Sequence, residues 1–270
     1  MALVDGAKKG RTLQRPWSFD DRANTYDNLQ WVRDSSLLTS MINLITEQRL
    51  AAASRVLDVA TGTGAVAEAL TRESNVVVGL DLSHPMLVRA QAHLQSKRIR
   101  YVRGMGEALP LSDQCMDLIV CRNGLHQMSD PRQAMMEISR VLRPSGVTCI
   151  IESVVPDPQI REEWRQIILL KDRGRHPDFV FTADEFENWV SVAGYEIVGT
   201  TGHDVPFDVN EWLTMGGLDE ARVSGVMDLF ENARSELIRA MAIERRKGSL
   251  WAMKRSHMVL ARTLTTDEPL

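Results

Sequence analysis

A short apolar run that leads into a glycine-rich turn constrains this chain most. Residues 55–59 read Arg-Val-Leu-Asp-Val, residues 60–64 contain two glycines, and residues 65–72 suit a helix. A second apolar run, residues 76–80, ends on Asp81. Glycines let the backbone approach a ligand closely, and a carboxylate at a strand end can accept hydrogen bonds from ribose hydroxyls. The pattern predicts a strand, a tight turn, a helix and a second strand that together bind a nucleoside cofactor.

The turn by itself fits two cofactors. Residues 62–67 match the G-x-G-x-x-G/A pattern of dinucleotide-binding proteins. Asp58, however, lies inside the strand, four residues before Gly62. A carboxylate there can reach an amino group at the turn, which S-adenosylmethionine (SAM) has and NAD lacks. Asp58 therefore favours SAM over a nicotinamide cofactor.

Three further segments follow in order along the chain. Residues 104–111 read Gly-Met-Gly-Glu-Ala-Leu-Pro-Leu, residues 116–126 form an apolar run that ends on His126, and residues 130–146 begin with Asp-Pro and end with Arg-Pro-Ser-Gly. With the glycine turn, this run resembles the class I SAM-dependent methyltransferases. It looks most like the small-molecule branch that includes the ubiquinone/menaquinone biosynthesis methyltransferases. The resemblance covers roughly residues 17 to 202, and the glycine turn alone would not carry it.

Alternating strands and helices predict an α/β fold. We expect strands near residues 54–60, 75–81, 98–103, 116–122 and 147–154, with helices between them, and later strands at 195–200 and 257–265. Such alternation implies a doubly wound, mostly parallel sheet with helices on both faces. Together with the resemblance, it implies a seven-stranded, Rossmann-like sheet.

The regions outside this alternation define the expected domain organisation. Residues 1–16 carry no periodicity and are expected to be a flexible N-terminus, and residues 17–50 form a helical cover. The SAM-binding core spans 51–156, with 179–204 and 249–265 as its remainder. Amphipathic helices are expected over 158–171 and 218–246, and the resemblance favours reading 157–178 and 205–248 as a helical substrate lid. The alternative is a helical layer that only extends the core.

Composition limits the kinds of molecule that this chain is expected to bind. The 270 residues carry a net charge of −4, which gives no global attraction to nucleic acid. The sequence has no apolar stretch of membrane-spanning length, no signal-peptide core and no clustered metal ligands. We therefore expect a cytoplasmic protein that acts on a small molecule, without nucleic acid, a membrane span or a metal.

The resemblance implies a set of site residues. Few catalytic groups are expected, because SAM is already activated and the protein mainly aligns the nucleophile with the methyl group. His126 and Arg122, in the loop after the fourth strand, and Tyr26, in the N-terminal cover, are expected nearest that methyl group. His126 is either a base or a support of its loop, and the second role is favoured. The residues expected to bind the cofactor are Tyr26, Asp58, Ala60, Thr61, Gly62, Gly64, Asp81, Leu82, Met86, Gly106, Glu107, Cys121 and Arg122.

The expected activity is methyl transfer from SAM to O or C of a small, mostly apolar molecule, with S-adenosylhomocysteine as product. A SAM-binding enzyme that transfers no methyl group remains possible on the same motifs. An NAD-dependent oxidoreductase is disfavoured by Asp58 and by residues 106–108. A nucleic-acid methyltransferase is disfavoured because the chain has neither a basic face nor an Asn/Asp-Pro-Pro-aromatic tetrad.

Overall fold

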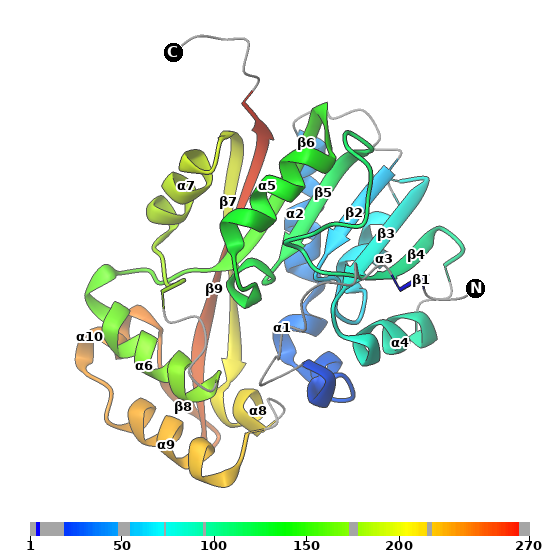
Figure 1. Cartoon of the computed structure of the whole chain (residues 1–270). Coiled ribbons are helices and arrows are strands. Elements are labelled where there is room, and N and C mark those ends of the chain that lie inside the picture. The colour runs from blue at the N-terminus through cyan, green and yellow to red at the C-terminus, as the bar shows by residue number, and fades with distance from the viewer. Residues whose placement is uncertain are drawn as a thin grey trace.

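A single mixed sheet forms the centre of the molecule (Figure 1). The computed structural model describes residues 4–5, 19–47, 55–72, 74–93, 96–172, 178–214 and 218–264. Within them the strands run in the order β4–β3–β2–β5–β6–β9–β7, with β1 (Val4–Asp5) beside β4 and β8 (Glu244–Arg246) paired to β9. The seven main strands are β2 (Arg55–Val59), β3 (Val76–Asp81), β4 (Ile99–Arg103), β5 (Met116–Arg122), β6 (Leu142–Ser153), β7 (Tyr195–Asp208) and β9 (Ser249–Thr263).

The strand directions confirm the predicted fold class. All pairs from β4 to β6 are parallel, and β9 is antiparallel to both of its neighbours, β6 and β7. Side chains of one strand alternate between the faces, so Leu57 and Val59 join one core cluster and Val56 joins the other. Helices α5 (Pro131–Val141) and α7 (Ala183–Val192) cover the first face. Helices α2 (Ser35–Glu47) and α3 (Ala65–Leu70) cover the second. The sheet is doubly wound.

The chain leaves β2 toward one edge of the sheet and later returns to its other side, and this change of direction determines where a ligand fits. From β2 the chain proceeds to β3 on one side and returns to β5 on the other. The loops after β2 and β5 therefore diverge and leave a crevice at the carboxyl ends of the strands. Both segments predicted to meet the cofactor, the glycine turn and the loop after β5, lie at this edge.

Side-chain caps begin several helices. Thr182 and Glu185 form a capping box at the start of α7, and the Ser83 hydroxyl accepts the N–H of Met86 in α4 (His84–His93). Asp208 accepts the N–H of Glu211 and begins the short helix α8 (Val209–Thr214). Gly194, with a positive φ of 93°, follows α7 and lets the chain turn into β7.

Strands β7 and β9 are much longer than predicted. We expected strands at 195–200 and 257–265 and placed 205–208 in the lid, but β7 continues to Asp208 and β9 begins at Ser249. Pairing with β6 stops at Ser153, whereas β7 and β9 stay paired as far as Asp208 and Trp251. A two-stranded ribbon therefore projects beyond the carboxyl edge of the sheet. Pro206 is tolerated because β7 pairs only with β9 among the described strands.

The prediction of a single helix over residues 218–246 is wrong. The chain instead forms α9 (Glu220–Glu231), α10 (Ser235–Ala240) and the strand β8. Lys247 and Gly248 both have positive φ, 49° and 90°, which makes a tight two-residue connection between β8 and β9. The prediction rested on apolar residues at helical spacing, and these do pack inward, but the first helix ends at Glu231 and β8 occupies the last of the predicted residues.

The N-terminal cover is interrupted rather than one continuous helix. Phe19–Arg22 and Tyr26–Asn28 form 3-10 helices, followed by α1 (Gln30–Arg33) and α2. Arg22 lies 3.8 Å from Asp172, at the end of α6 (Arg161–Lys171), so the cover meets the later helices. Of the expected flexible N-terminus, only Val4–Asp5 is among the described residues, and it pairs with β4 as β1.

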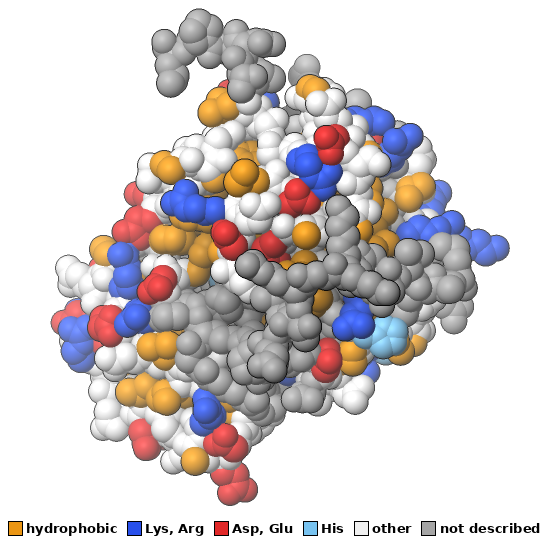
Figure 2. Space-filling model, in the orientation of Figure 1, with side chains coloured by type: hydrophobic (Ala, Val, Ile, Leu, Met, Phe, Trp, Pro, Cys, Tyr) orange, Lys and Arg blue, Asp and Glu red, His pale blue; other side chains and the backbone are white. Residues whose placement is uncertain are grey.

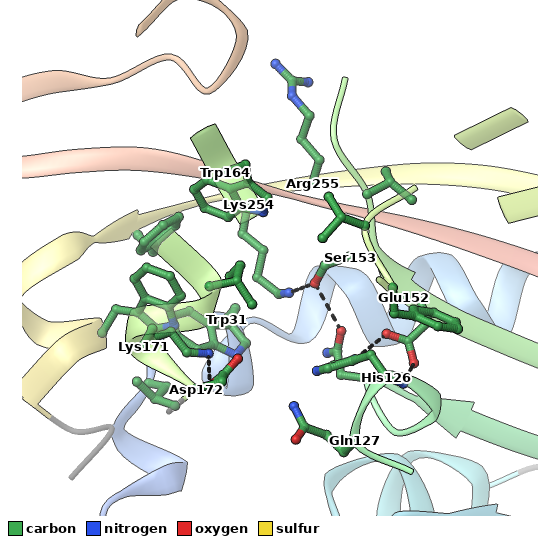
Figure 3. Close-up of a pocket in the computed structure, with 18 of the residues that line it drawn as sticks. Trp31, His126, Gln127, Glu152, Ser153, Trp164, Lys171, Asp172, Lys254 and Arg255 are labelled. Carbon is green, nitrogen blue, oxygen red and sulfur yellow. Dashed lines mark hydrogen bonds and ion pairs between the residues drawn. The ribbon is translucent and has the colours of Figure 1, made fainter. Parts of the chain in front are cut away.

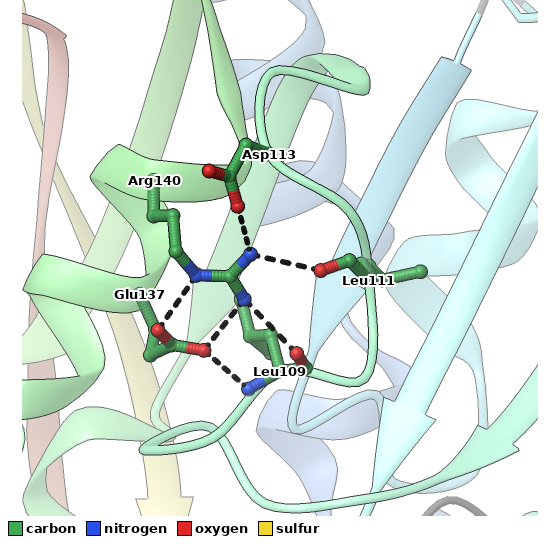
Figure 4. Close-up of polar contacts among 5 residues, drawn as sticks. All are labelled: Leu109, Leu111, Asp113, Glu137 and Arg140. Atoms are coloured by element: carbon green, nitrogen blue, oxygen red, sulfur yellow. Dashed lines mark hydrogen bonds and ion pairs between the residues drawn. The ribbon is translucent and has the colours of Figure 1, made fainter.

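One arginine ties α5 to the loop before β5 (Figure 4). The Arg140 guanidinium donates to both carboxylate oxygens of Glu137, at 2.8 Å each, and to the carbonyls of Leu109 and Leu111 at 3.0 and 2.9 Å. It also reaches Asp113 at 2.6 Å, while Glu137 accepts the N–H of Leu109. This planar fork of donors holds the loop that continues from Gly106 and Glu107.

Charged side chains of both signs lie on the face that Figure 2 shows. Basic and acidic groups are mixed over the left and centre of its described part, whereas Lys and Arg gather along the right edge. In the described part of the chain, no helix has the length and apolar character needed to cross a membrane.

Candidate active site

A first cavity of about 100 Å³ lies in the crevice at the strand ends. Backbone geometry at the glycine turn opens it, because Ala60 and Gly62 both adopt left-handed φ, at 58° and 55°. Gly62 has open space around its Cα, with Tyr26 the nearest group to an added Cβ at 3.9 Å. Gly64, with φ of 89°, lies directly before α3. The cavity is lined by Phe19, Tyr26, Ala60, Gly62, Leu80, Asp81, Leu82, Met86, Gly104, Met105, Gly106, Glu107, Arg122, Asn123, Gly124, Gln127 and Met128.

Asp58 lies behind the turn rather than in the cavity wall. It is buried, and its Oδ2 accepts a hydrogen bond of 2.6 Å from the Thr61 hydroxyl. Burial raises the pKa of Asp58 to about 7, although the bonds from Thr61 and from the N–H of Ala67 oppose this rise. A buried carboxyl group at this pKa is ready to ionise when a cation approaches.

Asp81 braces the turn from the next strand. Its Oδ2 accepts the N–H of Gly62 at 2.9 Å, and its Oδ1 accepts the N–H of Ser83 at 2.8 Å. The carboxylate thus joins the glycine turn to the start of α4 while lining the cavity. Its place at the tip of β3 is the one predicted for a ribose-binding carboxylate.

Side chains pack closely where the loops that carry Gly106 and Gly124 line this cavity. A Cβ on Gly106 would lie 2.5 Å from the Met128 methyl group, and one on Gly124 would lie 2.7 Å from both Ala60 Cβ and Cys121 Sγ. Glu107 accepts the N–H of Ser129 at 2.8 Å. Glycine at 106 and 124 therefore lets three loops meet at the cavity. Gly124 was not among the predicted residues, although its place in the loop after β5 was available from the sequence.

Arg122 and Tyr26 close the cavity on the side of the N-terminal cover. Arg122 is nearly enclosed, and burial lowers the pKa of its guanidinium. Its Nη2 donates to the carbonyl of Trp31 at 2.7 Å, whereas its buried Nε has no hydrogen-bond partner among the described residues. Burial also raises the pKa of Tyr26.

A second cavity of about 140 Å³ adjoins the first, and four residues, Phe19, Tyr26, Asn123 and Gln127, line both. Its floor comes from the end of β6 and the loop after β5, and its walls come from α1, α6, α8 and the β7/β9 ribbon (Figure 3). The remaining lining residues are Arg22, Leu29, Trp31, His126, Glu152, Ser153, Val154, Val155, Trp164, Ile168, Lys171, Asp172, Phe179, Val180, Phe207, Trp212, Met241, Lys254 and Arg255.

Aromatic side chains form much of the second cavity's wall. Trp164 and Trp212 stack with ring centroids 6.2 Å apart, and Trp31 meets Phe207 and Trp212 edge to face at 5.8 and 6.5 Å. These rings belong to a core cluster that is separate from the two clusters on the faces of the sheet. Helices α6, α8, α9 and α10 therefore share this third core with the N-terminal cover and the β7/β9 ribbon.

His126 lies in the second cavity, not the first. Its Nδ1 is 2.6 Å from Glu152 Oε2, and Glu152 Oε1 accepts the N–H groups of Leu125 and His126 at 2.8 and 3.5 Å. Glu152 is buried and comes from the end of β6, so one carboxylate holds both the imidazole and its loop. Glu152 was missed because an acidic residue in an apolar strand gave no sign of its partner.

Two lysines of the second cavity were also missed. Lys171 pairs with Asp172 at 2.8 Å and lies 4.8 Å from the ring centroid of Trp212. Lys254 comes from β9 and contacts the Ser153 hydroxyl. The prediction that began the last strand at residue 257 left Lys254 in the core but outside any predicted strand.

The structure brings together most of the predicted site residues around the first cavity. Tyr26, Ala60, Gly62, Asp81, Leu82, Met86, Gly106, Glu107 and Arg122 line it. Asp58, Thr61, Gly64 and Cys121 lie behind that wall, and His126 lines the neighbouring cavity. Cys121 is fully buried, and burial raises the pKa of its thiol.

Comparisons with known proteins agree with this geometry. Residues 57–150 match the family described as Methyltransferase domain. An uncharacterized methyltransferase of Bacillus subtilis, YcgJ, is 26% identical over 187 residues, which cover 67% of this chain and 73% of that protein. A demethylmenaquinone methyltransferase of Lactiplantibacillus plantarum is 37% identical over 124 residues, 43% of this chain. The chain spans 52% of the length of this second relative.

Solved structures share the fold across nearly the whole chain. The crystal structure of YcgJ has a TM-score of 0.75 at 22% identity and covers 86% of this chain and 100% of its own. A SAM-dependent methyltransferase from Thiobacillus denitrificans, in complex with S-adenosylhomocysteine, has a TM-score of 0.58 at 15% identity, with 89% and 97% covered. The [4+2]-cyclase SpnF has a TM-score of 0.64 at 19% identity, with 91% and 93% covered.

The doubly wound sheet, the glycine turn after β2 and the matching domain define a class I SAM-dependent methyltransferase. Within that class, the chain resembles demethylmenaquinone methyltransferases, to which it is 37% and 33% identical over 43% and 50% of its length.

Proposed function

We propose that this enzyme transfers the methyl group of SAM to O or C of a small, mostly apolar molecule held in the second cavity. The observation that carries the proposal is the boundary between the two cavities, where Phe19, Tyr26, Asn123 and Gln127 line both. A donor in the first cavity and an acceptor in the second would meet at these residues. Holding two reactants in line accounts for most of the acceleration that such a reaction needs.

The residues of the first cavity suit SAM. Gly62 admits close approach of the methionine end, and the carboxyl group of Asp58, behind it, would complement the amino group. The Nε of Arg122, which has no hydrogen-bond partner among the described residues, would bind the carboxylate of the methionine end. Asp81 would accept hydrogen bonds from the ribose hydroxyls, and Leu82, Met86 and Gly106 form an apolar slot for adenine. When bound, SAM supplies an electrophilic methyl group on a sulfonium.

We further propose that the helices of 157–178 and 205–248 act as a substrate lid, with their boundaries corrected to α6, α8, α9 and α10. Residues of α6 and α8 line the second cavity on the side opposite the ends of β5 and β6. These helices pack in a third core, apart from the two clusters on the faces of the sheet, together with the N-terminal cover and the β7/β9 ribbon. Residues 173–177 and 215–217 lie outside the described part of the chain.

The test has two stages. Calorimetry should show binding of S-adenosylhomocysteine and no binding of NAD. The enzyme should then be incubated with SAM and a panel of apolar hydroxyl- and carbon-nucleophile acceptors, and mass spectrometry should detect a methylated product and S-adenosylhomocysteine in equal amounts. NAD binding without S-adenosylhomocysteine binding would contradict the proposal.

A second candidate function is catalysis on a bound small molecule without methyl transfer. The shared fold of SpnF, which is named a [4+2]-cyclase, favours keeping this candidate. It predicts conversion of an acceptor in the presence of SAM with no S-adenosylhomocysteine formed. The same mass-spectrometric measurement separates the two functions. An NAD-dependent oxidoreductase is set aside, because residues 57–150 match a methyltransferase domain.

A further inference from the structure

Lys254 extends from the β7/β9 ribbon into the second cavity (Figure 3). It lies on β9 just beyond Ser256, opposite Val205 of β7, where β6 has already ended. Its ammonium group contacts the Ser153 hydroxyl and lies 6.0 Å from the ring centroid of Trp31. The long side chain therefore passes along apolar surface and places its nitrogen inside the cavity.

The other charged groups of this cavity have partners of their own. Lys171 pairs with Asp172, Arg255 with Asp204, and His126 with Glu152. Among the described residues, no carboxylate lies within ion-pairing distance of Lys254, and its contact is with a neutral hydroxyl. A buried amine without a counter-ion is costly to keep charged, so its position calls for a role.

The Ser153 hydroxyl links Lys254 to the boundary between the cavities. It donates a hydrogen bond of 3.4 Å to Asn123 Oδ1, and Asn123 lines both cavities. Asn123 has a positive φ of 51°, and its N–H donates to the carbonyl of Ile151 at 2.7 Å, which fixes the loop against β6. An acceptor hydroxyl placed beside Asn123 and Ser153 would face both the donor cavity and Lys254.

We propose that Lys254 is a catalytic base that takes the proton of an acidic hydroxyl on the methyl acceptor. This inference rests on the proposed methyl transfer. The neutral amine binds the hydroxyl proton, while the oxygen electron pair forms the bond to the methyl carbon. The carbon–sulfur bond breaks and its electrons return to sulfur, which leaves a neutral thioether and a methyl ether. The ammonium group of Lys254 then releases its proton to water.

The electrostatic surroundings agree with this role. Burial lowers the pKa of Lys254 to about 7, an effect that Arg122 on β5 and Lys171 on α6 increase and that Glu152 on β6 and Asp172 oppose. A base with a pKa near the working pH combines a sizeable neutral fraction with a useful affinity for the proton. His126 also faces this cavity, but its Nδ1 is held by Glu152, which ties it to the loop after β5.

The first test measures proton uptake without turnover. The probe is para-nitrophenol, whose phenolate absorbs visible light, bound to the enzyme with S-adenosylhomocysteine. In the wild type, the midpoint for ionisation of the bound probe should fall by about 1–3 pH units relative to the free probe, because an ammonium group forms beside the phenolate. Lys254→Met should abolish the shift, and Lys254→Arg should retain it. The control is Lys247→Met, in the exposed turn before β9, which should retain it as well.

The second test follows the amine itself. Labelling of Lys254 by trinitrobenzenesulfonate, read by mass spectrometry after proteolysis, should be half-maximal near pH 7. Half-maximal labelling of Lys254 only at about pH 10, as for a free amine, no saturable probe signal in the wild type, or an unchanged shift in Lys254→Met would each overturn the inference. Binding of S-adenosylhomocysteine is measured in parallel, since its absence would contradict the proposed function instead.

Discussion

His126 Nδ1 lies 2.6 Å from Glu152 Oε2, and the other oxygen of the same carboxylate, Oε1, accepts the N–H of Leu125 at 2.8 Å. One buried residue at the end of β6 therefore holds both the imidazole and the turn that carries it. Since this turn also carries Asn123 and Gln127, its conformation affects both cavities.

The first prediction concerns this pair. Glu152→Gln should lower the free energy of unfolding by about 1.5–3 kcal/mol, because a charged acceptor of several hydrogen bonds is lost from a buried site. Urea denaturation measures the change, and Glu231→Gln, at a largely exposed ion pair, should change it little.

His126→Ala should lower turnover and SAM affinity together, each less than about 100-fold. Lost turnover with intact SAM affinity would instead make His126 a base, which typically contributes about 10²–10⁴-fold.

The second prediction concerns Asp81 and the cofactor. Asp81→Ala should weaken S-adenosylhomocysteine binding by about 1.5–3 kcal/mol, the scale for losing charge-assisted hydrogen bonds. Asp81→Asn should be less severe, because an amide oxygen can still accept the N–H of Gly62. Calorimetry gives the affinities, and thermal melts without ligand show how much of the loss reflects the turn alone. Unchanged affinity in Asp81→Ala would exclude a contact with the cofactor.

The third prediction follows from the raised pKa of Asp58. The unfolded chain releases this proton near pH 3.8, whereas the folded protein keeps it up to about pH 7. Because the folded state binds more protons in this window, Asp58 makes stability fall as pH rises from about 4 to about 7. Asp58→Asn should therefore stabilise the ligand-free protein at pH 8, on the order of 2–4 kcal/mol, and much less at pH 5. Chemical denaturation at both values measures the difference.

The same substitution should weaken SAM binding. Wild-type affinity should rise with pH through about 7, as Asp58 ionises beside the amino group of the cofactor, and the Asp58→Asn protein should lose this dependence. Calorimetry in two buffers of different ionisation enthalpy would show proton release on binding. A wild-type affinity that does not change with pH would place the amino group elsewhere.

The fourth prediction concerns the Arg140 clamp. Arg140→Lys should destabilise the protein by about 1–2 kcal/mol, since a compact ammonium group cannot reproduce the planar fork that reaches Glu137 and both carbonyls. Cofactor affinity should fall as well, because the clamped loop continues from Glu107. Arg132→Lys, at an exposed position of the same helix, is the matched control for both measurements.

The fifth prediction tests the lid. Amide hydrogens of α6 and of α8 to α10 should exchange faster than those of β2 and β5 without ligand, and should slow when S-adenosylhomocysteine and an acceptor are bound. Helix α5, which packs on the sheet, serves as the internal reference. If the exchange rates of the four helices do not change when both ligands bind, the helices form a fixed layer and not a lid.

Local pattern in the sequence predicted the fold class and most of the first cavity. Apolar runs bounded by glycine and proline identify β2 to β6, and the glycine turn with Asp81 marks the crevice, because these residues are neighbours along one continuous unit. Helix caps such as Thr182 and Ser83 are equally local, because each accepts the N–H of the third residue after it. Each of these signals is a pattern within a short stretch of the sequence.

Only the tertiary structure decided the second cavity. Glu152 meets His126 across 26 residues, and Lys254 meets Ser153 across 101, so neither pair leaves a periodic signal in the chain. The long β7/β9 ribbon follows from strand pairing rather than from local propensity. The boundaries predicted at 205, 246 and 257 were wrong because they relied on local propensity alone. Sequence determined where the cofactor crevice forms, whereas packing between distant segments determined what lies beside it, because burial and pairing act through space and not along the chain.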